Sequence, residues 1–225
     1  KAKTSGSRWL PLVLLNSLLI QAGIYVVRPI ITYKSVELGA DAALVGLIGA
    51  TFALAPLVFA IQVGRFVDRG RAGLTMMLGS VILVLTTVAL LFINSIPLLM
   101  LAMPSLGMGH LLIMIGGQTL IANRSSQSQY EKNFGLLTFY ASVGHAVGPL
   151  VGGWLADNGT VNVNANAAFT FALVLFVVAV IGTIALSTKK ENAKPSVDVQ
   201  KSKLGAVLKT PTFKSAIFVA SATIA

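Results

Sequence analysis

The sequence predicts an all-α membrane protein, and three observations support this: its hydropathy, its long apolar stretches, and the position of its basic residues between those stretches. Of the 225 residues, 55% are hydrophobic and only 11% are charged, whereas a soluble domain carries about 25% charged residues. The mean hydropathy is +0.83. Too little polar surface remains to face water, so lipid is the expected solvent of this chain.

Six apolar stretches are each long enough to cross a bilayer as one helix, which needs about 20 residues. They lie at 10–33, 42–63, 73–93, 97–121, 134–155 and 167–186. Together they form a predicted N-terminal six-span bundle at 1–187. The first stretch is too long for a signal peptide, and no small-residue cleavage site follows it.

Two shorter segments follow the bundle. The segment 188–210 is polar and rich in Lys, without an apolar run, which predicts a cytoplasmic linker. The segment 211–225 is apolar but too short to cross, and Thr210 and Pro211 are typical of a helix N-cap and first turn. Since the chain also begins with Lys1, we expect it to be part of a longer protein, with 211–225 as the start of a seventh span.

The basic residues predict the orientation in the membrane. Of the 17 Lys and Arg residues, all but Arg28 and Lys34 fall on one side once the spans alternate in direction. Cytoplasmic segments carry the excess of Lys and Arg, so we expect the N-terminus inside, in an inner or plasma membrane.

The composition also excludes several classes of partner and cofactor. The net charge of +10 is spread between the spans and not over one face, which argues against nucleic acid. Cysteine is absent, so disulfides and cysteine-ligated metal sites are excluded. We expect no metal and no cofactor.

A repeat relates segment 46–70 to segment 135–159 at a constant offset of 89 residues. Both begin with Gly-Leu, and both end with Gly-x-x-x-Asp-x-Gly, at Gly64, Asp68 and Gly70 and at Gly153, Asp157 and Gly159. The copies are three spans apart and therefore face opposite sides, as inverted repeats of transporters do. The first copy alone carries basic residues, which the positive-inside bias requires of a cytoplasmic end.

Two motifs resemble those of the major facilitator superfamily. The segment Gly64-Arg-Phe-Val-Asp68-Arg69-Gly70-Arg71 is similar to the loop signature Gly-x-x-x-Asp-Arg-x-Gly-Arg-Arg. It lacks the residue between the Arg and the Gly, and Ala72 replaces the last basic residue. On the fifth span, the glycine signature of the proton-coupled antiporter branches is matched by Gly135, Gly144, Gly148, Pro149, Gly152 and Gly153.

The resemblance implies a six-helix half of a major-facilitator-type transporter, built as 3+3 inverted repeats. It implies a conformational latch in the first motif, formed by Gly64, Asp68, Arg69, Gly70 and Arg71. We expect Asp68 at the cytoplasmic start of the third span, where a carboxylate favours the helix dipole and can accept hydrogen bonds from Arg69, Arg71 or the other half. The alternative is a charged loop that only sets the topology.

The fifth-span motif has a structural and a functional interpretation. Gly144, Gly148 and Gly152 are four residues apart, so they share one helical face that another helix can approach closely. Pro149 removes a backbone donor and tends to kink the helix. The resemblance adds that this span moves during alternating access and limits leak.

Polar residues within the spans are the candidates for contact with substrate or protons. The ionisable ones are Arg28, His110 and His145, and such residues usually face a cavity or a partner. Imidazole carries protons near neutral pH, but each histidine could instead be neutral and bonded to a neighbouring helix, and Arg28 could snorkel to the outer surface. The weaker candidates are amides, which often bond between helices: Asn16, Gln21, Gln62 and Gln118.

We therefore expect a secondary active transporter, not an enzyme, in which two six-helix halves rock around a midplane site. The fifth-span motif favours efflux of a small organic compound in exchange for protons. Ion-coupled uptake of an anionic solute drawn by Arg28 is one alternative, and a non-transporting receptor or assembly factor on the same fold is another. The expected partners are the lipid bilayer, a small-molecule substrate, protons and the protein's own C-terminal half.

Overall fold

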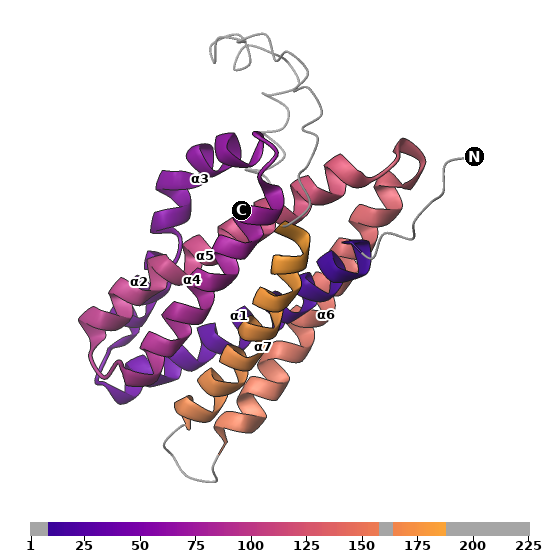
Figure 1. Cartoon of the computed structure of the whole chain (residues 1–225). Helices are drawn as coiled ribbons and strands as arrows, with labels where there is room; N and C mark the ends of the chain where they lie inside the picture. The colour runs from indigo at the N-terminus through magenta and orange to yellow at the C-terminus, as the bar shows by residue number, and fades with distance from the viewer. Residues whose placement is uncertain (1–8, 158–163, 188–225) are drawn as a thin grey trace, which may run out of the picture. The chain divides into compact units, whose positions relative to one another are not determined.

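The computed structural model describes residues 9–157 and 164–187, and throughout these ranges the regular secondary structure is helical (Figure 1). The predicted linker and the start of a seventh span lie outside the described residues. The helices are α1 (Trp9–Glu37), α2 (Ala42–Thr51), α3 (Leu54–Val67), α4 (Ala72–Phe92), α5 (Ile96–Arg124), a 3₁₀ turn η1 (Gln127–Gln129), α6 (Tyr130–Ala156) and α7 (Ala165–Ser187).

In the described part of the chain, six helical segments are long and apolar enough to cross a membrane. They are α1, α2 with α3, α4, α5, η1 with α6, and α7, and they coincide with the six stretches expected from the sequence. The chain is therefore an all-α, multi-pass membrane protein.

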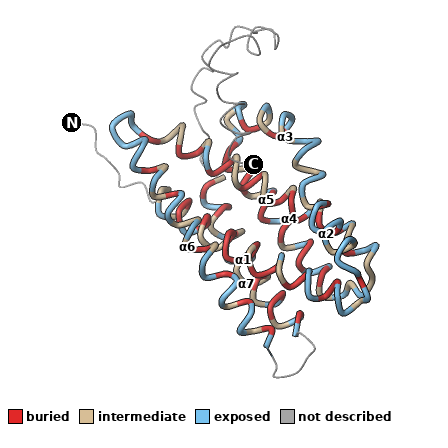
Figure 2. Tube along the Cα trace, turned by 180° about the vertical axis from the view of Figure 1, so that it is seen from behind, coloured by how far each residue is buried: buried red, intermediate tan, exposed pale blue. Residues whose placement is uncertain are grey.

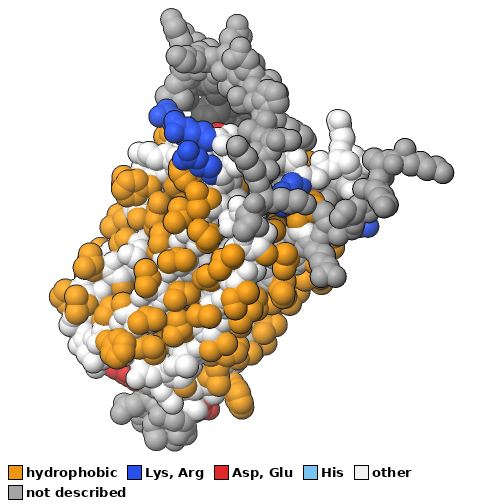
Figure 3. Space-filling view, viewed as in Figure 1, with side chains coloured by type: hydrophobic (Ala, Val, Ile, Leu, Met, Phe, Trp, Pro, Cys, Tyr) orange, Lys and Arg blue, Asp and Glu red, His pale blue; other side chains and the backbone are white. Residues whose placement is uncertain are grey.

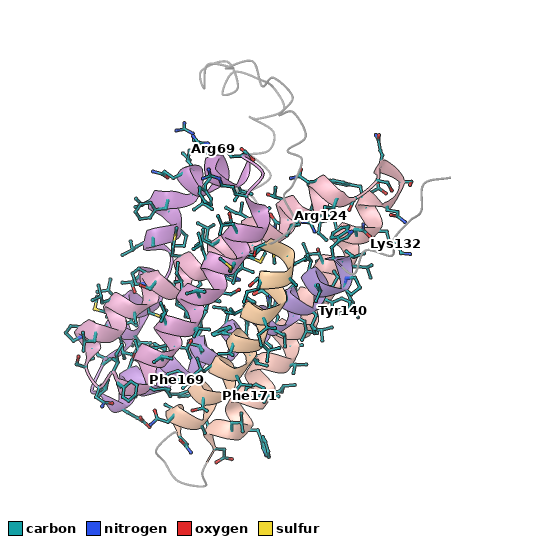
Figure 4. The ribbon with its side chains drawn as sticks, in the orientation of Figure 1. Arg69, Arg124, Lys132, Tyr140, Phe169 and Phe171 are labelled. Carbon is teal, nitrogen blue, oxygen red and sulfur yellow. The ribbon has the colours of Figure 1, made fainter. Side chains whose placement is uncertain are left out.

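The two ends of the helix bundle differ in charge. Apolar side chains cover the visible face between these ends, and Lys and Arg gather at the end near α3 (Figure 3). Figure 4 places Arg69, Arg124 and Lys132 toward this basic end and Phe169 toward the opposite one. The opposite end carries the acidic residues at the end of α1, the start of α2 and the end of α6, and we call it the acidic end: Glu37, Asp41 and Asp157.

The core of the bundle surrounds α1, which packs along α6 and α7, while α4 packs along α5 and α7 (Figures 1 and 2). Gly144, Gly148 and Gly152 of α6 face α1. A Cβ built on Gly144 or Gly148 would lie 2.6 Å from a backbone carbonyl oxygen of α1, that of Leu18 or Ala22. These two glycines therefore allow the backbones of α1 and α6 to approach closely, as small residues do between membrane helices.

The second span is not the single continuous helix expected from the sequence. It is interrupted between α2 and α3, at Phe52 and Ala53. Pro56 explains the interruption, because it has no N–H to donate to the carbonyl of Phe52 and its ring clashes with that carbonyl in a regular helix. The freed Phe52 oxygen lies against Gly107 of α5, so close that a Cβ at Gly107 would overlap it.

The packing partners follow the expected inverted repeat. If the first three spans correspond to the last three, α1 corresponds to α5 and the α2–α3 span to α6. In agreement with this, α1 packs on α6 while α5 packs on α2 and α3, and α7 packs on α1 while α4 packs on α5.

Candidate functional site

A cavity of about 220 Å³ opens among α1, α5 and α6 in the half of the bundle nearer the basic end. We call it the basic-half cavity. Its apolar wall includes Val13, Ile20, Met76, Ile113, Met114, Phe134, Leu137 and Ala141, and its polar wall includes Asn16, Ser17, Gln21, Gln118, Thr138, Ser142 and His145. Gln118, Thr138 and Ser142 are exposed, so the cavity is accessible from the side of α5 and α6.

A second cavity, of about 280 Å³, lies among α1, α2 and α5 in the other half of the bundle. We call it the acidic-half cavity. Its lining includes Tyr25, Arg28, Thr32 and Ser35 from α1 and Met103 from α5. Arg28 therefore lines a cavity and is at the same time exposed.

A layer of polar and aromatic side chains lies at mid-depth, between the two cavities. His110 Nε2 is 2.9 Å from Gln21 Oε1, and Gln21 Nε2 is 3.1 Å from Met114 Sδ. Because an amide oxygen only accepts hydrogen bonds, His110 must donate through Nε2. This bond ties α5 to α1 in the middle of the bundle.

Two ring contacts complete this mid-depth layer. His145 of α6 stacks on Tyr25 of α1 with the ring centroids 4.1 Å apart. The guanidinium carbon of Arg28 lies 4.8 Å from the centroid of the Phe52 ring, at the interruption of the second span. The Phe52 ring is in turn 6.0 Å from that of His110. We define the mid-depth layer as Gln21, Tyr25, Arg28, Phe52, His110 and His145.

Asn16 lies apart from this layer, toward the basic end. Its Nδ2 donates a hydrogen bond of 2.9 Å to the carbonyl oxygen of Ala179 on α7. The residue lines the basic-half cavity and is only 2% exposed. The sequence grouped it with Gln21 and Gln118, all three of which line this cavity; Gln62, the fourth amide, is exposed on α3.

The loop after α3 differs from the sequence expectation in one respect. Asp68 is the C-cap of α3, where its backbone N–H bonds to Gly64, so it ends the second span and does not start the third. Gly70 has a φ of +77°, and it and Arg71 both donate to the carbonyl of Val67. This backbone conformation is one that glycine adopts without strain.

The side chains of the expected latch are spread out along this loop. Asp68, Arg69 and Arg71 are exposed. The guanidinium carbon of Arg71 lies 4.9 Å from the centroid of the Phe66 ring. Among the residues that the structure describes, no hydrogen bond to the Asp68 carboxylate is found, which leaves that carboxylate available to a partner outside them.

The sequence did not single out Tyr25 or Phe52. An aromatic residue in an apolar span gives no signal that separates a ring facing a cavity from one facing lipid. Pro56 was the available signal for Phe52, since a proline four residues after it predicts a broken turn there.

Comparison with known proteins adds a family and a group of relatives. The sequence model of the Major Facilitator Superfamily matches residues 13–225. The quinolone resistance protein NorA of Staphylococcus aureus, in strains Mu50, N315 and MW2, is 29% identical over 171 residues. The match covers 76% of this chain and 43% of each relative, so the chain matches less than half the length of these relatives.

Proposed function

Because the chain belongs to the Major Facilitator Superfamily, we propose that it is one half of a secondary active transporter that exports a small organic compound in exchange for protons. The six helices would rock as a unit against a second half, so that a central site opens to each side of the membrane in turn. The relatives named for quinolone resistance support export of a drug-like compound.

The observation that carries the proposal is the position of the two histidines at the mid-depth end of the basic-half cavity. His145 lines this cavity and stacks on Tyr25, and His110 bonds to Gln21, which also lines it. A histidine can gain and lose a proton near neutral pH. A compound in this cavity would therefore meet a proton carrier, as exchange of the two requires.

We place the basic end of the bundle in the cytoplasm, following the positive-inside bias. The basic-half cavity is then the side from which an exported compound enters. A topology reporter fused at Ser196 should read cytoplasmic and one fused at Val161 external. The opposite pair of results would reverse the orientation and would make the same cavity an exit.

The second half of the transporter would dock on the second and fifth spans. In the most apolar 18-residue stretch of each of these two spans, only 11% of the residues are buried, compared with 61% in the corresponding stretch of α1. In the same two spans, Gly46, Gly49, Gly64, Gly135 and Gly153 have open space where a Cβ would be. A face with few side chains is what close packing against another helix needs.

Uptake of an anionic solute is the second candidate, and the position of Arg28 favours it. This cation lines the acidic-half cavity, which would face outside. However, its guanidinium lies over the Phe52 ring, an arrangement that stabilises the cation without an anion. The described residues that line the basic-half cavity include no Lys or Arg, so an anion would have to leave Arg28 without meeting a second Lys or Arg among them.

Flux into proteoliposomes tests the proposed exchange. The full-length protein should move a fluorescent quinolone several-fold faster when a pH gradient is imposed, and a protonophore should abolish the difference. His145→Phe keeps a ring for Tyr25 to stack on but cannot carry a proton. This variant should retain downhill flux and lose the response to the gradient. Flux that never responds to pH would exclude proton exchange.

A further inference from the structure

In the side-chain amide of Asn16, the nitrogen has a hydrogen-bond partner and the oxygen has none among the described residues. Its Nδ2 bonds to the carbonyl of Ala179, which can only accept. This fixes the orientation of the amide, since Oδ1 cannot take the place of Nδ2 there. Oδ1 is buried, and no described residue donates a hydrogen bond to it.

An unpaired acceptor at this position is unusual. About 90% or more of buried polar groups in proteins have a hydrogen-bond partner. Asn16 is 2% exposed and lines the basic-half cavity, so a compound bound in this cavity can supply the donor that the described residues do not. The bond to α7 holds the acceptor in place before any donor arrives, which lowers the entropic cost of binding.

The rest of the cavity limits what that donor can belong to. Within the described part of the chain, its lining contains no Asp, Glu, Lys or Arg, and most of the lining surface is apolar. An anionic group would have to lose its hydration beside an acceptor and without a cation. A compound with an apolar body and one N–H or O–H group, either neutral or carrying a single positive charge, would satisfy both the wall and Oδ1.

The volume agrees with this class of compound. An apolar cavity of about 150 Å³ takes a benzene molecule. The basic-half cavity, at about 220 Å³, has room for a somewhat larger ring system with a short polar substituent. The exposed side at Gln118, Thr138 and Ser142 leaves space for the remainder of a longer compound.

We propose that the basic-half cavity binds amphipathic compounds that carry a hydrogen-bond donor, and that Asn16 Oδ1 selects them by accepting that hydrogen bond. The proposal rests on the proposed function, because it names the substrate class of the same transporter. Asn16 selects between compounds of equal charge and similar size, which a purely apolar cavity discriminates only weakly.

A matched pair of ligands tests this selection. The naphthylmethyl-dimethylammonium ion carries one N–H, and its trimethylammonium analogue has the same charge and ring but no donor. Equilibrium binding of each to the full-length protein in lipid nanodiscs can be followed by naphthalene fluorescence anisotropy at pH 7. The wild type should bind the N–H ion about tenfold more tightly, the effect of one charge-assisted hydrogen bond.

Variants of Asn16 separate selection from folding. Asn16→Leu is similar in size and removes the acceptor, so the tenfold ratio should fall to about one while the trimethylammonium ion still binds. Asn16→Asp keeps an acceptor but loses the Nδ2 donor to Ala179; its charge acts on both ions alike, so both affinities should change while the N–H ion still binds more tightly. Thr87→Val removes a hydroxyl that is fully buried in α4 and bonded to Leu83; this control should leave the ratio unchanged.

Three results would overturn the proposal. The wild type could bind both ions equally, Asn16→Leu could keep the tenfold ratio, or Asn16→Leu could weaken both ions by the same factor. The last result would make Asn16 only a tie between α1 and α7. These outcomes are independent of the proteoliposome flux, so loss of exchange with an intact ratio would reject the proposed function and leave the binding selectivity standing.

Discussion

The two copies of the repeat, 46–70 and 135–159, share a sequence pattern but are built differently. The first copy is broken at Phe52 and Ala53, whereas the second continues through Pro149 as the unbroken helix α6. The prolines are not at equivalent positions, since His145 is the counterpart of Pro56 at the offset of 89 residues. The repeat therefore conserves the ends of the helix, and its middle differs between the copies.

The difference follows from what each copy packs against. The glycines in the middle of α6 meet the backbone of α1, so that α1 supports the helix around Pro149. In the first copy, Gly107 of α5 instead receives the free carbonyl of Phe52. In the second copy, glycines of α6 itself allow α1 to approach closely. In the first copy, a glycine of the neighbouring helix α5 leaves room for the interruption.

The shared ends are similar in detail. Asp68 and Asp157 are each the C-cap of their helix. The backbone N–H of each donates a hydrogen bond to the carbonyl oxygen of the glycine four residues earlier, Gly64 or Gly153. After the cap the chains diverge. Asp68 keeps a helical conformation that leads into the turn at Gly70, whereas Asp157 is extended.

The largest effect is expected from filling the contact between α6 and α1. Gly148→Leu inserts a side chain where an added Cβ alone would lie 2.6 Å from the Ala22 carbonyl oxygen. Overpacking of this kind costs about 1–3 kcal/mol, which can shift a conformational equilibrium by roughly 5- to 150-fold. Transport should fall by a factor in that range while membrane insertion stays normal.

A glycine of another helix is the control for this prediction. Gly182 of α7 has only an ordinary contact at its Cβ position, the Asn16 Nδ2 atom at 3.9 Å, and lies outside the two spans proposed to dock the second half, so Gly182→Leu should retain more of the transport than Gly148→Leu. The reverse ranking would show that the face toward α1 is not the tight one, and the antiporter assignment based on the glycine motif would lose its support.

The next largest effect on transport should distinguish the two C-cap aspartates, Asp68 and Asp157. Asp68→Asn should reduce transport at least tenfold if the exposed carboxylate pairs with the second half, since a pair that loses its charge loses most of its attraction. Asp157→Asn, at the equivalent cap of the other copy, should change transport less than twofold. A cysteine introduced on the cytoplasmic side should also change its accessibility to a thiol reagent in Asp68→Asn alone. Equal effects of both variants would leave the first motif with a topological role only.

A smaller effect is expected from repairing the break. Pro56→Ala restores the N–H that the Phe52 carbonyl lacks, so α2 and α3 should tend to join and draw that carbonyl away from Gly107. The Phe52 ring would then leave Arg28, and we expect a change of a few-fold in transport rate with little loss of protein. A spin-label distance across 46–61 that stays unchanged in the variant would show that Pro56 does not cause the interruption.

The fold could be predicted from the sequence because the bilayer imposes a length and a hydropathy on every span. The candidate site could be predicted only in part. His110, His145 and Gln21 stood out, because a polar residue in an apolar span is costly and rarely placed without a partner. Tyr25 and Phe52 did not, since their rings are equally stable in lipid. The free oxygen of Asn16 could not be anticipated either, because it depends on which amide atom meets Ala179 across the bundle.

The smallest expected effects concern two glycines of the first copy, whose substitution should change the melting temperature in opposite directions. Gly70 has a φ of +77°, and a side chain in the left-handed region costs about 1–2 kcal/mol. Gly70→Ala should therefore lower the melting temperature of the detergent-solubilised protein by a few degrees. Gly64 is helical with open space at its Cβ position, so when residues 9–187 are melted alone Gly64→Ala gains up to about 1 kcal/mol of helix propensity and should raise that temperature. In the full-length protein the proposed second-half helix would occupy the open space at Gly64, so the same variant should lose this gain there. A gain of the same size in the full-length protein would show that no helix packs against Gly64.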